Sequence, residues 1–144
     1  PGGKTAILNA VGEREVARLL LQISGVAAAA TSLDDLLVTA IVSASESLRA
    51  HRALNYLLAH EPQVILPLMA FDRLESVLEL ARTMWSPLLT RFVPETVASE
   101  LVEWGARMVI SHTFAPGLVD PCSPTQVRRL VEELLLPGVH SLHH

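Results

Sequence analysis

Apolar residues recur every three to four positions along most of this chain, the spacing that gathers them on one face of an α-helix. No alternation of apolar and polar residues, the pattern of a half-buried β-strand, persists for more than a few positions. The sequence therefore predicts an all-α protein of six to eight helices in one domain. The helices expected from this spacing cover residues 4–23, 32–49, 50–60, 72–90, 94–114 and 124–136.

Two serines mark helix starts. Ser32 is followed three residues later by Asp35, and Ser123 by Gln126, so each serine hydroxyl can accept a hydrogen bond from an N–H of the first turn. Gln126 can also reach back toward Ser123 and complete a capping box. Pro94 is expected at the first position of its helix, where an N–H has no partner in any case.

Proline and glycine mark the expected interruptions. Pro1-Gly2-Gly3 is predicted to be a turn, and Pro137-Gly138 is predicted to end the last helix. Residues 139–144 would then be a flexible tail or the remnant of an expression tag. Pro67 inside a helix would cost about 3 kcal/mol, so a break is expected near it, between residues 65 and 71.

The helices over 94–114 and 124–136 carry more apolar surface than one small domain can cover from within. Half of the 144 residues are hydrophobic and the mean hydropathy is +0.38, a high value. A membrane-spanning helix needs about 20 nearly uncharged apolar residues, and every apolar run here is interrupted sooner. We therefore expect no membrane association, and a partner chain that covers these two helices.

The helix over 94–114 has two apolar faces of different size. The bulky face suits the chain's own interior, whereas the small face would let another helix approach closely. The bulky face comprises Val97, Leu101, Trp104, Met108 and Ser111, and the small face comprises Ala98, Val102, Gly105, Val109 and His112. The expected dimer interface joins the small face to the last helix and consists of Ala98, Val102, Gly105, Val109, Val127, Leu130, Val131 and Leu134.

A pocket for an apolar molecule is expected between the helices over 32–49, 50–60, 72–90 and 94–114. Such pockets are lined by large apolar side chains with a few polar groups, and methionine adapts to irregular shapes. The expected ligand-binding residues are Leu37, Ile41, Tyr56, Met84, Trp85, Trp104 and Met108. Polar contacts would come from His51, Asn55, Tyr56 and His112.

No pattern in the sequence supports catalysis or metal binding. The histidines lie far apart, no nucleophile, histidine and acid form a recognisable set, and there is no HExxH motif. We therefore expect no enzymatic activity, no cofactor and no metal. The net charge of −4 gives no overall basic surface for nucleic acid. With a single cysteine, Cys122, and no signal peptide expected, the predicted location is cytoplasmic.

The first eight residues, PGGKTAIL, resemble the junction that follows the recognition helix in TetR-family transcriptional regulators. There, a turn of the type Phe-Pro-x-Lys/Gly-Lys introduces the helix that links the DNA-binding head to the ligand-binding body. Residues 49–61, RAHRALNYLLAHE, followed by PQVILPLMAFDRL, are similar to the helix and proline-interrupted turn before the family's long pocket helix. Residues 94–136 match the placement of its last two helices.

The resemblance implies a TetR-like C-terminal helical domain that forms a homodimer and binds an apolar small-molecule effector. Residues 1–23 would be the end of the DNA-binding junction and the linking helix, and residues 24–138 the ligand-binding and dimerisation domain. The last two helices would meet those of a second copy as a four-helix bundle. Lys4 matches the family lysine that contacts a DNA phosphate. DNA would be read by a helix-turn-helix that this sequence does not contain.

These features favour a ligand-responsive transcriptional regulator that acts as a repressor. The alternative is a helical dimerisation or adaptor module without DNA binding, which would use the same last two helices to pair with a different protein.

Overall fold

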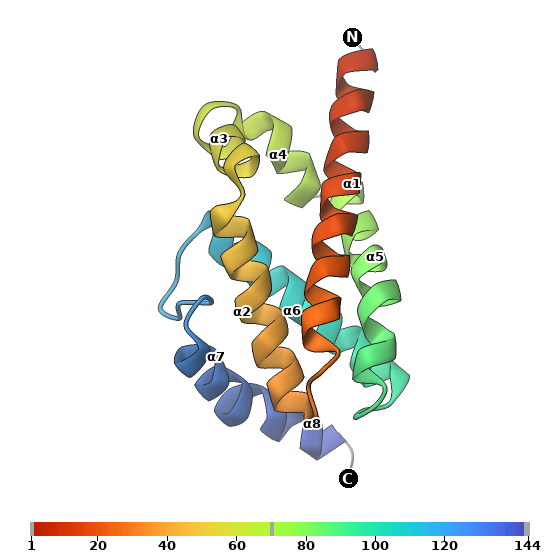
Figure 1. Ribbon diagram of the computed structural model, residues 1–144, viewed down its shortest axis with the longest axis vertical. Helices are drawn as coiled ribbons and strands as arrows, with labels where there is room; N and C mark the ends of the chain where they lie inside the picture. The colour runs from red at the N-terminus through yellow and green to blue at the C-terminus, as the bar shows by residue number, and fades with distance from the viewer. Residues whose placement is uncertain (1, 70, 143–144) are drawn as a thin grey trace.

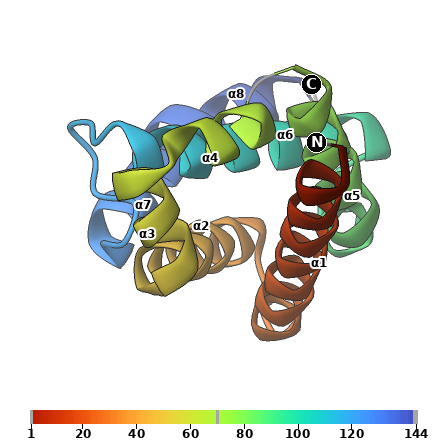
Figure 2. The same ribbon diagram turned by 90° about the horizontal axis from the view of Figure 1, so that it is seen from above.

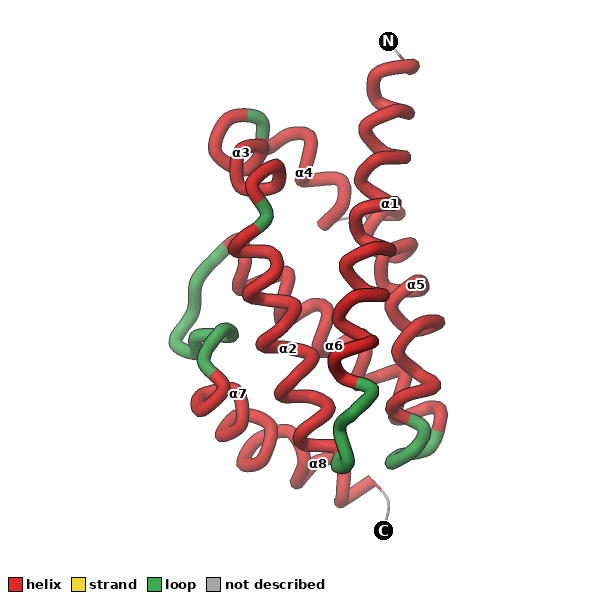
Figure 3. The backbone as a smooth tube through the Cα atoms, in the orientation of Figure 1, coloured by secondary structure: helices red, strands yellow, loops and turns green. Residues whose placement is uncertain are grey.

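The protein is helical throughout the part that the structure describes. The computed structural model describes the backbone of residues 2–69 and 71–142, and the side chains in these ranges except those of residues 2, 4–9, 66–69, 71–73 and 140–142. Figure 3 shows helices joined by loops and no strand within these ranges, which confirms the predicted all-α class. The elements are α1 (Gly2–Ala27), α2 (Leu33–Ala50), α3 (Arg52–His60), α4 (Pro62–Met69), α5 (Phe71–Leu89), α6 (Glu95–Phe114), α7 (Pro124–Leu130), the π-helical segment η1 (Val131–Leu135) and α8 (Leu136–Leu142).

Four long helices form a closed ring. α1 packs against α2 on one side and α5 on the other, and α6 packs against both α2 and α5 from the opposite side (Figure 1, Figure 2). α3 and α4 lie together at one end of the ring, where they join α2 to α5. α7 and η1 pack against α2. The C-terminal segment therefore packs against the ring through α2, which is itself one of the four ring helices.

The core draws on helices that are far apart in the sequence. The largest fully buried side chains include Leu36 of α2, Leu78 and Leu89 of α5, Val127 of α7 and Val131 of η1. Each such burial contributes roughly 1.5–3 kcal/mol relative to an exposed side chain. The C-terminal helices thus belong to the same core as the ring.

Both predicted serine caps are confirmed. The Ser32 hydroxyl accepts a hydrogen bond from the N–H of Asp35 at 3.3 Å, and the Ser123 hydroxyl accepts one from the N–H of Gln126 at 3.3 Å. The side chain of Gln126 reaches past Ser123, because its Oε1 accepts from the N–H of Asp120 at 2.8 Å. Gln126 therefore ties the preceding loop to α7 instead of closing the expected capping box.

The break expected between residues 65 and 71 is confirmed, because α4 ends at Met69 and α5 begins at Phe71, but it does not fall at Pro67 itself. α4 runs through Pro67, where packing against α3 and α5 supports a helix that lacks one internal hydrogen bond. The end of the last helix expected at Pro137-Gly138 is wrong, because this helix continues past Pro137 to Leu142. It does so through a π turn, in which the N–H of Leu136 bonds to the carbonyl of Val131. A wider turn displaces the carbonyl that a proline ring would strike in a regular α-helix.

The expected limits of the first helix and of the tail are also corrected. α1 already includes Gly2 and Gly3, so these glycines are not in a turn, and it continues to Ala27. Ile23 and Ala27 are buried, and their packing holds the last turn in helical form beyond Gly25. At the other end Val139 is buried within α8, so residues 139–142 are not a flexible tail. Residues 143 and 144 lie outside the described range.

Candidate ligand-binding cavity

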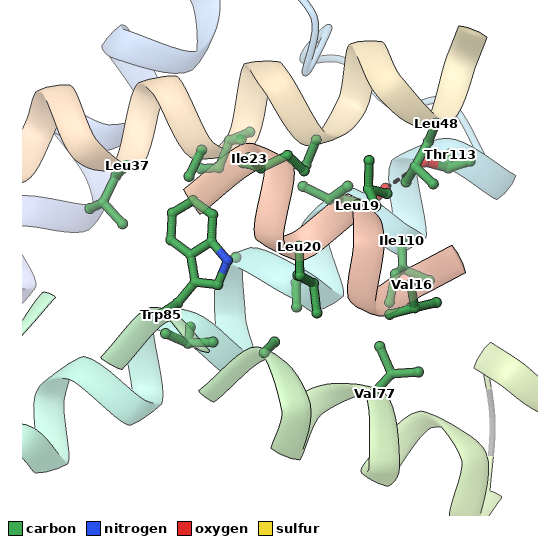
Figure 4. Close-up of a pocket in the computed structure, with 18 of the residues that line it drawn as sticks. Val16, Leu19, Leu20, Ile23, Leu37, Leu48, Val77, Trp85, Ile110 and Thr113 are labelled. Carbon is green, nitrogen blue, oxygen red and sulfur yellow. Dashed lines mark hydrogen bonds between the residues drawn. The ribbon is translucent and has the colours of Figure 1, made fainter. Parts of the chain in front are cut away.

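The ring of α1, α2, α5 and α6 surrounds an apolar cavity of about 210 Å³ (Figure 4). Leu54 of α3 and Ile65 of α4 also line it. For comparison, a dry apolar cavity of about 150 Å³ is sufficient to bind benzene. The cavity can therefore hold a small molecule of about one ring.

One wall of the cavity is the apolar face of α1. Val16, Leu19, Leu20 and Ile23 follow one another at three- and four-residue intervals, so all four point to the same side of the helix. The other walls are Leu36, Leu37, Ala40, Ile41, Ala44 and Leu48 of α2; Val77, Ala81, Trp85 and Leu89 of α5; and Leu101, Val102, Gly105, Ala106, Val109, Ile110, Thr113 and Phe114 of α6.

The cavity exists because small residues take positions that a filled core would give to larger ones. Ala40 and Ala44 on α2, Ala81 on α5, and Gly105 and Ala106 on α6 all line it. A Cβ atom added at Gly105 would meet no atom within 4 Å. Protein interiors are otherwise close-packed, so space of this size beside small residues indicates room for a ligand.

The lining carries no charge and few polar atoms. No Asp, Glu, Lys or Arg is among the described residues that line the cavity. The Thr113 hydroxyl donates to the carbonyl of Val109 at 2.8 Å, so its hydrogen already has an acceptor. The indole Nε1 of Trp85 is buried and has no hydrogen-bond partner within the described part of the chain. Because a buried unpaired charge is strongly unfavourable, the cavity suits a neutral molecule.

Three of the seven expected ligand-binding residues line this cavity, namely Leu37, Ile41 and Trp85. Met84, Trp104 and Met108 pack against or within the core but do not line the cavity. Tyr56 is 60% exposed, and its ring lies 4.5 Å from that of His60 on the surface of α3. The expected site and the cavity thus share helices, but Trp104 and Met108 of α6 lie outside the cavity lining.

Both faces of α6 lie largely inside the chain, because Leu101 of the bulky face also lines the cavity and Met108 is buried. Ala98 is fully buried inside the chain, and Val102, Gly105 and Val109 line the cavity, so these four residues do not form an outer surface. Their small size does allow another helix to come close, as expected. The neighbours are α2 and α5 of the same chain.

The C-terminal residues expected at the interface divide into buried and accessible ones. Val127 and Val131 are fully buried against the chain's own core, whereas Leu130 is only partly buried. Leu134 is 69% exposed. Within this group, only Leu130 and Leu134 leave apolar surface open to a second molecule.

The wall formed by α1 was not predicted as part of the pocket. The sequence does show an apolar face on this helix, formed at three- and four-residue spacing by Val16, Leu19, Leu20 and Ile23. What the sequence did not show is that this face meets α2 and α5 around an open space.

The expected polar contacts to a ligand are engaged elsewhere. The Asn55 side-chain amide donates to the carbonyls of Arg49 at 2.8 Å and His51 at 2.9 Å. The Nδ1 of His112 bonds to the carbonyl of Met108 at 2.9 Å, and since a carbonyl only accepts, this nitrogen carries the proton. These side chains stabilise helix ends and turns of their own backbone.

His51 connects α1 to the joint between α2 and α3. Its Nδ1 accepts from the N–H of Leu54 at 3.1 Å, so His51 caps the start of α3. Its Nε2 lies 3.3 Å from the Oε2 of Glu15 on α1. The carboxylate of Glu15 also bonds to Arg18 at 2.7 Å, and hydrogen bonds from Arg18 and then His51 lower the pKa of Glu15. The helix that lines one side of the cavity is thus held to the neighbouring joint by a polar contact.

Other expected features lie outside what the structure describes or have no site there. The side chain of Lys4, expected at a DNA phosphate, is outside the described side chains. Among the described residues, no group of three or more histidines, cysteines or carboxylates could hold a metal ion. In the same part of the chain, every helix is too short or too polar to cross a membrane.

Comparisons of this chain with protein-family models, with curated proteins and with solved structures found no match.

Proposed function

We propose that this chain is the ligand-binding and dimerisation body of a TetR-like transcriptional regulator that acts as a repressor. A neutral, apolar small molecule would occupy the cavity, and a helix-turn-helix preceding Pro1 in the intact protein would bind DNA. The observation that carries the proposal is that α1, the helix that would lead to such a head, is itself one wall of the cavity.

Coupling between ligand and DNA follows from the two halves of α1. The C-terminal half contributes Val16, Leu19, Leu20 and Ile23 to the cavity, whereas the N-terminal end extends beyond the neighbouring helices (Figure 1). A ligand that binds more tightly to one position of α1 than to another shifts the population toward that position. A small rotation near the cavity then becomes a larger displacement at the far end of a 26-residue helix.

In a dimer this displacement would change the distance between two DNA-binding heads. Paired half-sites on DNA are separated by a fixed number of helical turns, so a change of spacing weakens binding. Two copies would meet through accessible side chains of α6 and of the α7–η1–α8 segment. Trp104, Leu130 and Leu134 are the candidates, because the chain's own core leaves each of them partly or largely exposed.

The test uses the full-length protein with its N-terminal region. Gly105→Leu would fill part of the cavity, and Gly105→Ala is the matched control that adds only one carbon. We expect the unmodified protein and the control to bind a preferred DNA sequence in a salt-dependent manner, and to release it when a small neutral apolar compound raises their melting temperature. Gly105→Leu should bind the same DNA but respond less to the compound. A full-length protein without sequence-preferring DNA binding would contradict the proposal.

The alternative is a helical dimerisation or adaptor module, which the net charge of −4 favours because it supplies no basic surface. Under this alternative the accessible residues of the terminal helices would bind a different protein, and filling the cavity would leave that binding unchanged. A full-length protein that forms such a complex and does not bind DNA would select this function.

A further inference from the structure

The indole N–H of Trp85 is a buried donor without an acceptor. Trp85 is only 7% exposed, and its Nε1 has no hydrogen-bond partner in the described structure. The residue lines the cavity, and Figure 4 shows its nitrogen on the side of the ring that faces Leu20. Leaving a buried donor unpaired costs about 1–3 kcal/mol. Native interiors seldom retain such a group without a purpose, and at the wall of a cavity that purpose can be a ligand.

Within the described part of the chain, no group accepts a hydrogen bond from the Trp85 indole N–H. Thr113, the other side chain with a polar group in the lining, lies at the opposite end of the close-up in Figure 4. The labelled side chains nearest the indole there are Leu20, Ile23 and Leu37, all apolar. A buried water needs two to four polar partners. The labelled side chains nearest Trp85 in Figure 4 provide no polar group beyond the indole N–H itself.

We infer that the cavity binds a neutral, mostly apolar molecule with one hydrogen-bond acceptor, of the ketone or ester type, whose carbonyl oxygen receives the Trp85 N–H. This inference rests on the proposed function, since it defines the ligand class of the same cavity. A hydrocarbon would fill the space but leave the donor unpaired. A carboxylate would bring a charge to a lining that has no cation to balance it.

Two probes of nearly the same shape test the inference. Cyclohexanone and methylenecyclohexane differ only in that an oxygen replaces a CH₂ group, and each is of the size that a cavity of about 210 Å³ accepts. Both are titrated into the unmodified protein and into Trp85→Phe, which removes the N–H but keeps an aromatic ring. Trp104→Phe is the matched control, because it makes the same chemical change outside the cavity lining.

We expect Trp85→Phe to weaken cyclohexanone binding about three- to tenfold more than methylenecyclohexane binding, the effect of one neutral hydrogen bond. Trp104→Phe should change both affinities equally. The ratio between probes is the decisive quantity, because any change in cavity shape caused by Trp85→Phe affects both probes alike.

The indole proton gives a second, independent measurement. In nitrogen-15 NMR spectra the protein has two indole N–H signals, one for each tryptophan, and Trp104→Phe assigns the remaining one to Trp85. The Trp85 proton signal should move downfield with cyclohexanone and much less with methylenecyclohexane, because only the ketone accepts its hydrogen bond.

The outcomes separate this inference from the proposed function. If both probes bind but Trp85→Phe weakens them to the same extent, the cavity binds ligands and the role of Trp85 is refuted. If neither probe binds at millimolar concentration, ligand binding in the cavity is refuted, and the inference fails with it.

Discussion

His51 shows how a single side chain can determine the relation of three helices. Its Nδ1 accepts a hydrogen bond from a backbone N–H, so that nitrogen carries no proton and the proton of the neutral ring lies on Nε2. The Nε2–H then faces the carboxylate of Glu15 at 3.3 Å. One imidazole therefore caps α3 and holds α1. The sequence suggested a polar contact to a ligand here, because it could not show which backbone group the ring meets.

We expect His51→Ala to lower the free energy of unfolding by about 1 kcal/mol, because it removes the cap of α3 as well as the contact to Glu15. His51→Asn should lose less, since asparagine is a good N-cap that cannot reach Glu15 in the same way. Urea denaturation of the three proteins measures the difference. Equal losses for Ala and Asn would mean that the cap contributes nothing to stability.

At the scale of the element, α6 determines the site. Its small residues face α2 and α5, and because their side chains are short, the space between these helices stays open as the cavity. Met108 packs into the core from the adjacent face. Periodicity correctly predicted a helix with two apolar faces. It could not predict which face turns toward the ring, because both faces are apolar and the choice depends on how α6 crosses two helices that are distant in the sequence.

Substitutions at Gly105 test whether the space beside α6 is open. Gly105→Ala should raise the free energy of unfolding by up to about 1 kcal/mol, because glycine weakens a helix interior and an added Cβ meets no atom within 4 Å. Chemical denaturation followed by circular dichroism measures the gain. Gly105→Arg should instead destabilise the fold, since it brings a charge to an apolar cavity. A destabilised Gly105→Ala protein would show that the space beside Gly105 is not open in solution.

At the scale of the whole molecule, the surplus of apolar residues that suggested a partner chain divides into buried and exposed residues. Much of it is buried by the ring and by the packing of α7 and η1 on α2, within a single chain. The remaining exposed apolar residues are spread over several elements, and among the described side chains Leu134 is the one exposed large hydrophobic residue of the α7–η1–α8 segment. A dimer, if formed as proposed, depends on a smaller surface than the sequence suggested.

Leu134→Asp should convert the proposed dimer to a monomer at micromolar concentration, because the interface would bury an unpaired charge. Leu118→Asp is the matched control. Leu118 is a fully exposed leucine in the loop between α6 and α7, so the same substitution there should leave the dimer intact. Sedimentation velocity distinguishes the two species. A Leu134→Asp protein that remains dimeric would place the interface on another surface.

The sequence alone was sufficient for the helical class, for most helix positions and for the caps at Ser32 and Ser123, because these depend on spacing and on contacts within one turn. Tertiary packing decided the rest. It carried α4 through Pro67 and the last helix through Pro137, it turned the small face of α6 inward, and it made α1 a wall of the cavity. Each of these outcomes balances a local preference against contacts between distant helices. Those contacts are determined by the arrangement of the whole ring, which no single stretch of sequence contains.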